Sequence, residues 1–195
     1  MNKRLISQST YNVSKWSGGE TTEVFLFPPE GQFKLNEFDY RVSTAKVAMA
    51  ESTFSNLPGY KRIIMSLDNP LELHHKDESN FRKEKLAPFQ TDYFCGSDET
   101  KSFGRCTDFN LIYSPKYGGE MKTKLSEEVI KLQKNVVYVL YALQDIVLTS
   151  TKDNENIHVS KGDSLLIEDI QEIEQLTIDS SVKNSNPVLV EVSIR

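Results

Sequence analysis

The chain has 195 residues, of which 38% are hydrophobic and 26% are charged, as in an ordinary globular protein. Its net charge of −5, without any run of basic residues, disfavours nucleic acid as a partner, because phosphate contacts need clustered cations. The chain start lacks the apolar stretch of a secretory signal, and no apolar run approaches the ~20 residues that span a bilayer. These features predict a cytoplasmic protein without a membrane partner.

The first half of the chain is a series of short β-type runs separated by turn residues. Strands are predicted at Glu23–Pro29, Phe38–Ala50, Lys61–Leu67, Pro70–His75, Phe89–Gly96 and Asp108–Ser114. The segment Phe54–Tyr60 contains a Pro-Gly turn. The polar residues 76–85 are expected to form a loop or an exposed hairpin.

Strand character resumes after an interruption near residues 115–122. Val136–Ser150 is predicted to be a strand pair or one long bent strand, and a short strand precedes the Gly162-Asp163 turn. Further strands are expected at SLLIE, QLTID and PVLVEVSIR. The stretch Gly119–Gln133 fits helical spacing and alternation alike, and we favour a strand there. Many short strands with scarcely any helix predict an all-β sandwich or barrel.

Three pairs of polar residues share one spacing along the predicted strands. The pairs are Thr21 and Glu23, Arg41 and Ser43, and Asp108 and Asn110. Members spaced i, i+2 face the same side of a strand, and strict alternation places Phe25 and Phe27 on the face of Glu23. The neighbouring residues are apolar, so these polar side chains are expected to be buried.

Charge balance leaves two interpretations of the buried ionisable residues. Glu23, Arg41, Arg62 and Asp108 supply two charges of each sign. They could form a buried ion-pair network that fixes the strand order, since a buried charge needs a partner. They could equally line the mouth of a barrel and meet a ligand.

The other residues that could bind a ligand or a metal give weaker evidence of function. Trp16, beside Gly18 and Gly19, could stack on a planar ligand or pack as a lid on the core. His74 and His75 are adjacent, so they point to opposite faces of a strand, and no His-x-His motif exists. We therefore expect surface or edge-strand histidines, no metal and no cofactor. Cys95 and Cys106 are expected to be reduced and buried.

A family resemblance follows from five segments taken in order and spacing. GETTEVFLFPP, YRVSTAKV, FSNLPGYKRII, FQTDYFCG and DFNLIYS, within residues 16–114, resemble the HutD/Ves family. The resemblance implies a cupin-like, RmlC-like jelly-roll barrel over residues 1–195, with two barrel halves in one chain, a bicupin, near 1–115 and 116–195. It also implies a bacterial protein that binds a metabolite such as urocanate or formiminoglutamate and limits expression of the histidine-utilisation pathway.

Carried over by position, the resemblance implies a set of ligand-binding residues and no catalytic or metal-binding ones. The set is Trp16, Thr21, Glu23, Arg41, Ser43, Arg62, Asp108 and Asn110. Arg41 or Arg62 would clamp a carboxylate, Glu23 or Asp108 would accept from a nitrogen, and Trp16 would cover the planar part.

Four further matches to the family, Phe54, Ser55, Pro58 and Gly59, are read as structural. The loop after Trp16 departs from the family pattern of Trp-x-Asn-Gly followed by glycine, because it is shorter and lacks the Asn.

Two other kinds of function stay open. A metal-independent isomerase or hydrolase of a small carboxylic acid would use Glu23 or Asp108 as its general base, although a shared fold does not establish chemistry. A scaffold protein would use exposed strand edges to pair in a homodimer. The resemblance favours a metabolite-binding protein over an enzyme.

Overall fold

The computed structural model describes residues 1–181 and 185–195, and its regular structure there is almost entirely β. One short 3-10 helix, Gln8–Thr10, is the exception among the described residues. The all-β prediction is therefore confirmed. None of the described helices is long and apolar enough to cross a membrane.

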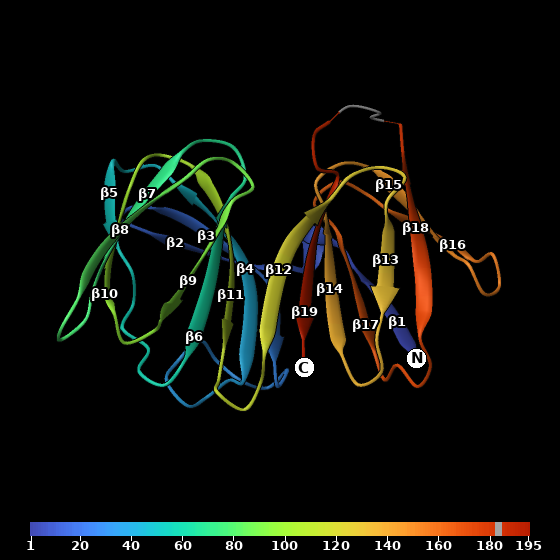
Figure 1. The fold of residues 1–195 in the computed structure, drawn as a ribbon, viewed down its shortest axis with the longest axis horizontal. Helices are drawn as coiled ribbons and strands as arrows, with labels where there is room; N and C mark the ends of the chain where they lie inside the picture. The colour runs from blue at the N-terminus through green and yellow to red at the C-terminus, as the bar shows by residue number, and fades with distance from the viewer. Residues whose placement is uncertain (182–184) are drawn as a thin grey trace. The chain divides into compact units, whose positions relative to one another are not determined.

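The chain divides into two compact units, whose strands are labelled in Figure 1. One unit is formed by residues 11–118, and the other by residues 1–10 together with 119–195. We call them the 11–118 unit and the 119–195 unit. The first strand, β1 (Asn2–Ile6), pairs with β17 (Ser164–Glu168), which explains why the first ten residues belong with the distant part of the chain.

The 11–118 unit contains two antiparallel sheets. Its strands are β2 (Asn12–Trp16), β3 (Gly19–Phe27), β4 (Tyr40–Val47), β5 (Glu51–Thr53), β6 (Lys61–Ser66), β7 (Leu71–Lys76), β8 (Phe81–Leu86), β9 (Thr91–Cys95), β10 (Glu99–Phe103) and β11 (Thr107–Tyr113). The six-stranded sheet has the order β2-β3-β4-β11-β6-β9, and the four-stranded sheet has the order β5-β10-β7-β8.

The 119–195 unit also contains two antiparallel sheets. Besides β1 and β17, its strands are β12 (Gly119–Lys124), β13 (Val129–Leu132), β14 (Val137–Ala142), β15 (Ile146–Ser150), β16 (Asn156–Val159), β18 (Glu174–Ser180) and β19 (Leu189–Ile194). The five-stranded sheet has the order β1-β17-β14-β19-β12, and the four-stranded sheet has the order β13-β18-β15-β16.

The two units repeat one strand order. In the 11–118 unit, one sheet contains the order β4-β11-β6-β9 and the other has the order β5-β10-β7-β8. In the 119–195 unit, the corresponding orders are β12-β19-β14-β17 and β13-β18-β15-β16. Each strand of the second set lies eight strands after its counterpart in the first. The additional strands are β2 and β3 in one unit and β1 in the other.

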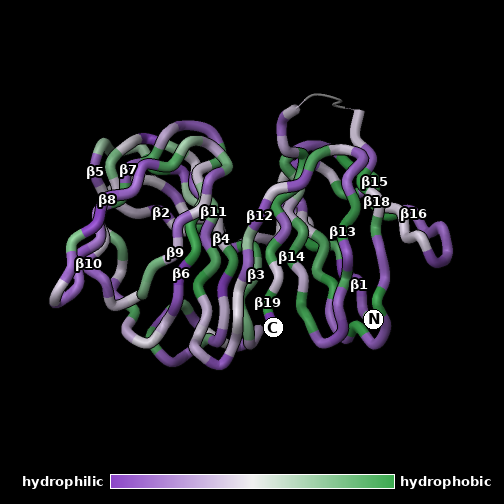
Figure 2. Tube along the Cα trace, viewed as in Figure 1, coloured by the Kyte–Doolittle hydropathy of each residue, from purple (hydrophilic) through white to green (hydrophobic). Residues whose placement is uncertain are grey.

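Each unit has its own apolar interior. In the 119–195 unit, residues such as Leu140, Leu148 and Leu176 are fully buried in one cluster, and Figure 2 shows hydrophobic stretches along the strands there. In the 11–118 unit, one cluster includes Ile64 and Leu73. The alternation of buried and exposed residues along β7 and β15 is that of strands with one face on a core.

Several strand predictions are settled by the structure. The stretch Gly119–Gln133 forms β12 and β13, so the preference for strand is confirmed. Val136–Ser150 forms two strands, β14 and β15, which belong to different sheets and do not pair with each other. The polar residues 76–85 lie in a hairpin, because β8 pairs with β7. Alternation did not reveal β1, β2, β5 or β10, which are short and mostly polar.

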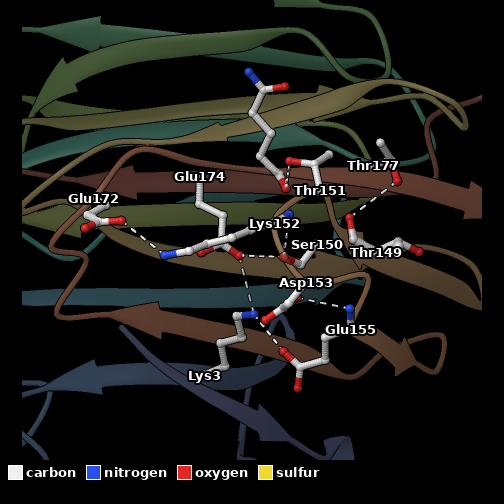
Figure 3. A network of polar contacts seen from close by, with 11 residues as sticks. Lys3, Thr149, Ser150, Thr151, Lys152, Asp153, Glu155, Glu172, Glu174 and Thr177 are labelled. Carbon is white, nitrogen blue, oxygen red and sulfur yellow. Dashed lines mark hydrogen bonds and ion pairs between the residues drawn. The ribbon is translucent and has the colours of Figure 1, made fainter.

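A polar network fastens β1 inside the 119–195 unit, as Figure 3 shows. Lys3 of β1 forms ion pairs with Glu155, at 2.8 Å, and with Glu174 of β18, at 3.6 Å. The Oγ of Ser150 also donates to Glu174, at 2.9 Å. Lys3 and Glu174 are largely shielded from solvent, so β1 is held by more than its ladder with β17.

Candidate functional site

Polar side chains from three neighbouring strands face one side of the six-stranded sheet. The register places Ser43 of β4 opposite Asn110 of β11. Two positions further, Ile112 of β11 lies opposite Arg41 of β4 and Arg62 of β6. Directly paired residues point to the same face, so the predicted i, i+2 pairs do share a side, and three strands build one polar surface.

A bulge in β3 corrects the face predicted for its apolar residues. The register shifts between Glu23 and Phe25, so that Glu23 pairs with Ser43 while Leu26 pairs with Arg41. Leu26, and not Phe25 or Phe27, therefore follows Glu23 on the polar face. A β-bulge inserts one residue into a strand and reverses the alternation beyond it, which strict period-two counting misses.

This face borders a cavity of about 310 Å³ within the 11–118 unit, which we call the Arg62 cavity. Seven of the eight predicted residues line it: Trp16, Thr21, Arg41, Ser43, Arg62, Asp108 and Asn110. The eighth, Glu23, does not line it and instead holds Arg41 in place. The sequence pattern thus found side chains that the fold brings together from five strands.

Arg41 is held by the protein through two of its three guanidinium nitrogens. It is buried, its Nε donates to Oε2 of Glu23 at 2.6 Å, and its Nη1 donates to Oγ of Ser43 at 3.1 Å. The guanidinium also lies over the ring of Phe33, with Cζ 4.2 Å from the ring centroid. These contacts fix the orientation of Arg41 and neutralise its charge.

Arg62 is buried but only partly engaged. Its Nη1 donates to the carbonyl oxygen of Ser55 at 3.2 Å, and its Cζ lies 4.7 Å from the ring centroid of Phe54. Its Nε has no hydrogen-bond partner among the described residues. Burial lowers the pKa of Arg62 to about 10, with Asp108 opposing this shift and Arg41 adding to it. The side chain therefore stays charged at neutral pH with a donor to spare.

Asp108 lies in the same cavity as a shielded carboxyl group. Its Oδ1 accepts a 2.5 Å hydrogen bond from Nδ2 of Asn110, whose Oδ1 has no partner in the described part of the chain. Burial raises the pKa of Asp108 to about 7, although Asn110 and Arg62 act in the opposite direction. The carboxyl group can therefore gain or lose a proton near neutral pH.

The two interpretations of the four ionisable residues each hold in part. Glu23 and Arg41 form the expected ion pair. Arg62 and Asp108 do not come within ion-pair distance of each other, and both line the cavity. Two of the four residues are thus paired with each other, and the other two line the cavity.

Trp16 forms part of the cavity wall at the β2–β3 hairpin. Its Nε1 donates to Oγ1 of Thr21 at 3.2 Å, and the side chain stays 40% exposed. The indole lies directly over Gly18, where an added Cβ would come within 1.9 Å of the ring. The shortened loop is thus a tight turn whose glycine leaves room for the indole beside the cavity.

Several lining residues were missed in the sequence. Phe33, Ser52, Thr53, Phe54 and Ser55 also border the cavity. Phe54 and Ser55, which were assigned structural roles, both contact Arg62 at the cavity wall. The neighbouring Pro58–Gly59 is a turn as predicted. The Tyr60 amide donates to the Leu57 carbonyl, and Gly59 has a φ of +87°.

His75 differs from the prediction of surface or edge-strand histidines, whereas His158, exposed on the edge strand β16, agrees with it. β7 lies between β10 and β8, and His75 on it is buried. Its Nδ1 is 2.9 Å from Oγ1 of Thr100, and its Nε2 is 2.9 Å from Oδ2 of Asp92, an ion-pair distance without hydrogen-bond alignment. Arg82 holds the same carboxylate through two donors. The polar partners explain why a histidine is tolerated in this apolar layer.

Cysteine and metal-ligand chemistry complete the description of the site residues. Cys106 is buried as expected, whereas Cys95 is only half-buried, with Nζ of Lys61 3.2 Å from its Sγ. Both cysteines are free. Within residues 1–181 and 185–195, no three His, Cys, Asp or Glu side chains cluster in a way that could hold a metal ion.

Comparison with known proteins identifies the class of fold. A vicilin from tomato has a TM-score of 0.68 at 6% identity, covering 97% of this chain and 84% of its own, and such neighbours are cupins. A conserved protein of unknown function from Pseudomonas aeruginosa PAO1 has a TM-score of 0.79 at 23% identity, covering 100% and 99% of the two chains. The fold is all-β and cupin-like.

The family is shown by the sequence itself. The HutD family model matches residues 8–184, so the chain belongs to the HutD family. The structure of HutD from Pseudomonas fluorescens SBW25 is similar, with a TM-score of 0.75 at 20% identity, covering 99% of this chain and 98% of that one. No curated protein matches the chain.

Proposed function

We propose that this chain is a cytoplasmic bacterial protein that binds a small carboxylic acid in the Arg62 cavity. As a HutD-family member, it would limit expression of the histidine-utilisation pathway when that acid is bound. Urocanate and formiminoglutamate are the preferred ligands, since each combines a carboxylate with a planar group that bears N–H donors.

The observation that carries this proposal is a spare donor and a spare acceptor on two residues that line one cavity. Nε of Arg62 and Oδ1 of Asn110 are buried without hydrogen-bond partners in the described chain. An unsatisfied buried polar atom costs about 1–3 kcal/mol, which a complementary ligand recovers. A carboxylate would accept from Arg62, and an N–H group would donate to Asn110.

The hydrogen bonds of Arg41 favour Arg62 as the residue that binds the carboxylate. Arg41 already binds Glu23 and Ser43, whereas Nε of Arg62 has no hydrogen-bond partner in the described chain. Arg62 is therefore the group that would clamp the carboxylate. Trp16 and Phe54, which border the same space, offer aromatic surface for a planar ligand.

The repeated strand order supports a proposal about the architecture as well. We infer that each unit is a cupin jelly roll and that the chain is a bicupin. The basis is the match between β4–β11 and β12–β19, strand by strand, in both sheets. A site on the inner face of a jelly roll is where cupin-like scaffolds enclose small ligands.

The test is calorimetric titration of the protein with urocanate and with its methyl ester. Arg62→Met removes the guanidinium but keeps an apolar stem, and Lys15→Met removes an exposed cation on the opposite face of β2. We expect saturable binding of urocanate, at least about tenfold weaker for the ester and for Arg62→Met, and unchanged for Lys15→Met, because a charge-assisted hydrogen bond is worth at least this factor. Equal affinity for acid and ester would contradict the assignment of Arg62.

One observation favours a second function. Asp108 has a pKa raised to about 7 by burial, which suits a general base near neutral pH. A metal-independent isomerase or hydrolase would use this carboxylate on the acid held by Arg62. Nuclear magnetic resonance of a urocanate or formiminoglutamate solution distinguishes the two: product formation that Asp108→Asn abolishes supports the enzyme, and an unchanged spectrum supports the binding protein.

A further inference from the structure

We propose that the 119–195 unit holds a second small-molecule site, for a small carboxylic acid that carries its own hydrogen-bond donor, such as a hydroxy acid or an amino acid. A cavity of about 270 Å³ lies among β12, β13, β14 and β19. We call it the Glu191 cavity. All the contacts on which it rests lie in the 119–195 unit.

The Glu191 cavity occupies the place in its unit that the Arg62 cavity occupies in the other. The ladders begin at matching strand ends, Tyr40, Tyr113 and Lys61 in one unit and Gly119, Ile194 and Val137 in the other. Counted from these ends, Glu191 matches Asn110, Lys122 matches Ser43, and Tyr138 matches Arg62. The corresponding inner face is therefore hollow in both units, but its charges differ.

Glu191 is the unsatisfied group of this cavity. It is 3% exposed, and its Oε1 is 3.0 Å from Nζ of Lys122. Its Oε2 has no hydrogen-bond partner among the described residues, since Nζ of Lys124 is 3.8 Å away and donates to the carbonyl oxygen of Val129. A buried carboxylate oxygen without a donor is costly, so it favours a ligand that brings an O–H or N–H group.

The cations around Glu191 favour an acid. Lys122, Lys124, Lys131 and Arg195 line the cavity, against the carboxylates Glu120 and Glu191. Glu120 is paired with Arg195, whereas Lys131 has no ion-pair partner in the part of the chain that the structure describes. An excess of positive charge in a confined space attracts a carboxylate, and the lysines can hold it while Glu191 accepts from the ligand's donor.

Tyr138 fixes the cavity wall and has no free donor for the ligand. Its hydroxyl donates to the carbonyl oxygen of Lys131 and accepts from the amide of Gln133, both at 3.1 Å. Tyr138 thus stands at the position of Arg62, and its hydroxyl binds the backbone at and just after β13. The specificity of the second site therefore rests on Glu191 and the lysines.

The experiment compares L-malate with succinate, which differ only by the hydroxyl group. Both are titrated calorimetrically into Arg62→Met, in which the Arg62 cavity has lost its cation, so that the outcome does not depend on the function proposed for that cavity. We expect saturable binding of malate, about tenfold or more tighter than succinate, because the hydroxyl donates to a charged acceptor.

Variants in the Arg62→Met background locate the site. Glu191→Gln should bring the affinities for malate and succinate to within about twofold of each other, since the charged acceptor is lost. Lys131→Met should weaken both acids several-fold, whereas Lys161→Met, an exposed lysine that does not line the cavity, should change neither. Lys131 is exposed, so its replacement keeps the test valid if Glu191→Gln does not fold.

Three outcomes would overturn the proposal. They are the absence of saturable malate binding, equal affinities for malate and succinate in the Arg62→Met protein, and the same loss of affinity in Lys131→Met and Lys161→Met. Protein resonances of β12 and β13 should shift on titration with malate. Shifts confined to β4 and β11 would place the binding in the Arg62 cavity and contradict a second site.

Discussion

Two guanidinium groups on nearby strands show how hydrogen bonding separates a structural role from a binding role. Arg41 and Arg62 are equally buried, each at 6% exposure, and each lies over an aromatic ring. Arg41 has a carboxylate and a hydroxyl to donate to, whereas Arg62 has one carbonyl and an unused Nε. The difference is in the partners and cannot be read from residue type or strand position.

The carboxyl of Asp108 should make stability depend on pH. Its folded-state pKa of about 7 lies above the ~3.9 of an unfolded aspartate, so the folded state holds the proton more tightly. Stability is therefore unaffected below about pH 4, falls as pH rises towards 7, and stays low above that. The total loss is on the order of 4 kcal/mol at most.

Asp108→Asn should remove this loss. The amide oxygen can still accept from Asn110, and no charge is buried at high pH. Urea denaturation at pH 5 and pH 8 should show a smaller difference for the variant than for the wild type, with the variant the more stable at pH 8. An identical pH dependence in the two proteins would show that Asp108 stays ionised throughout.

The residues of the Arg62 cavity illustrate what alternation can and cannot reveal. Spacing i, i+2 among apolar neighbours was enough to indicate Arg41, Ser43, Asp108 and Asn110. It could not indicate Phe33, because that residue lies in the long segment between β3 and β4, where no periodicity exists. Nor could it show the buried setting of His75, whose partners are Thr100, directly opposite on β10, and Asp92 on β9 of the other sheet.

At the scale of elements, bulges and short strands limited prediction. The bulge in β3 changes which face Leu26 occupies, and a bulge leaves no reliable trace in an apolar run. β5 has three residues, and β10 mixes Glu, Thr, Lys and Ser, so neither carries a hydrophobic pattern. Long apolar strands such as β4, β6 and β14 were predicted because their residues alternate or are buried on both faces.

The attachment of β1 gives a testable contrast between two lysines of one network. Lys3 is largely buried against Glu174, whereas Lys152 pairs with Glu172 in solvent (Figure 3). Lys3→Met should destabilise the protein by about 1–2 kcal/mol, because a shielded carboxylate loses its cation. Lys152→Met should cost clearly less than Lys3→Met, because an exposed ion pair contributes little to stability.

Thermal or urea unfolding of the two variants provides the measurement. A larger loss of stability in Lys152→Met than in Lys3→Met would contradict the importance of burial in this network. Both substitutions remove one positive charge and retain an unbranched apolar side chain, so the comparison isolates the surroundings of the charge.

At the scale of the whole molecule, the division of the chain does not follow its sequence. Linear halves such as 1–115 and 116–195 describe the strand-rich regions, but β1 pairs with β17 and the first ten residues join the 119–195 unit. The sequence of residues 2–6 does not predict this pairing, because a short polar strand could pair with the edge strand of many sheets. The repeated strand order, in contrast, follows from strands that were mostly predictable.

Deletion of residues 1–10 should affect one unit selectively. β17 would lose its β1 ladder and become an edge strand, so its amides should exchange hydrogen faster. Hydrogen exchange followed by mass spectrometry should show this acceleration in residues 164–168, with β6 and β11 of the 11–118 unit unchanged. Acceleration of similar size in both units would contradict the division.

The pairing of β1 with β17 also sets an order for folding on the ribosome. Residues 11–118 supply all the strands of their own two sheets, so this unit can form while the rest of the polypeptide is still being synthesised. β1 has no ladder to join until residue 168 has left the exit tunnel. Nascent chains stopped before that point would therefore carry β1 as an unpaired segment.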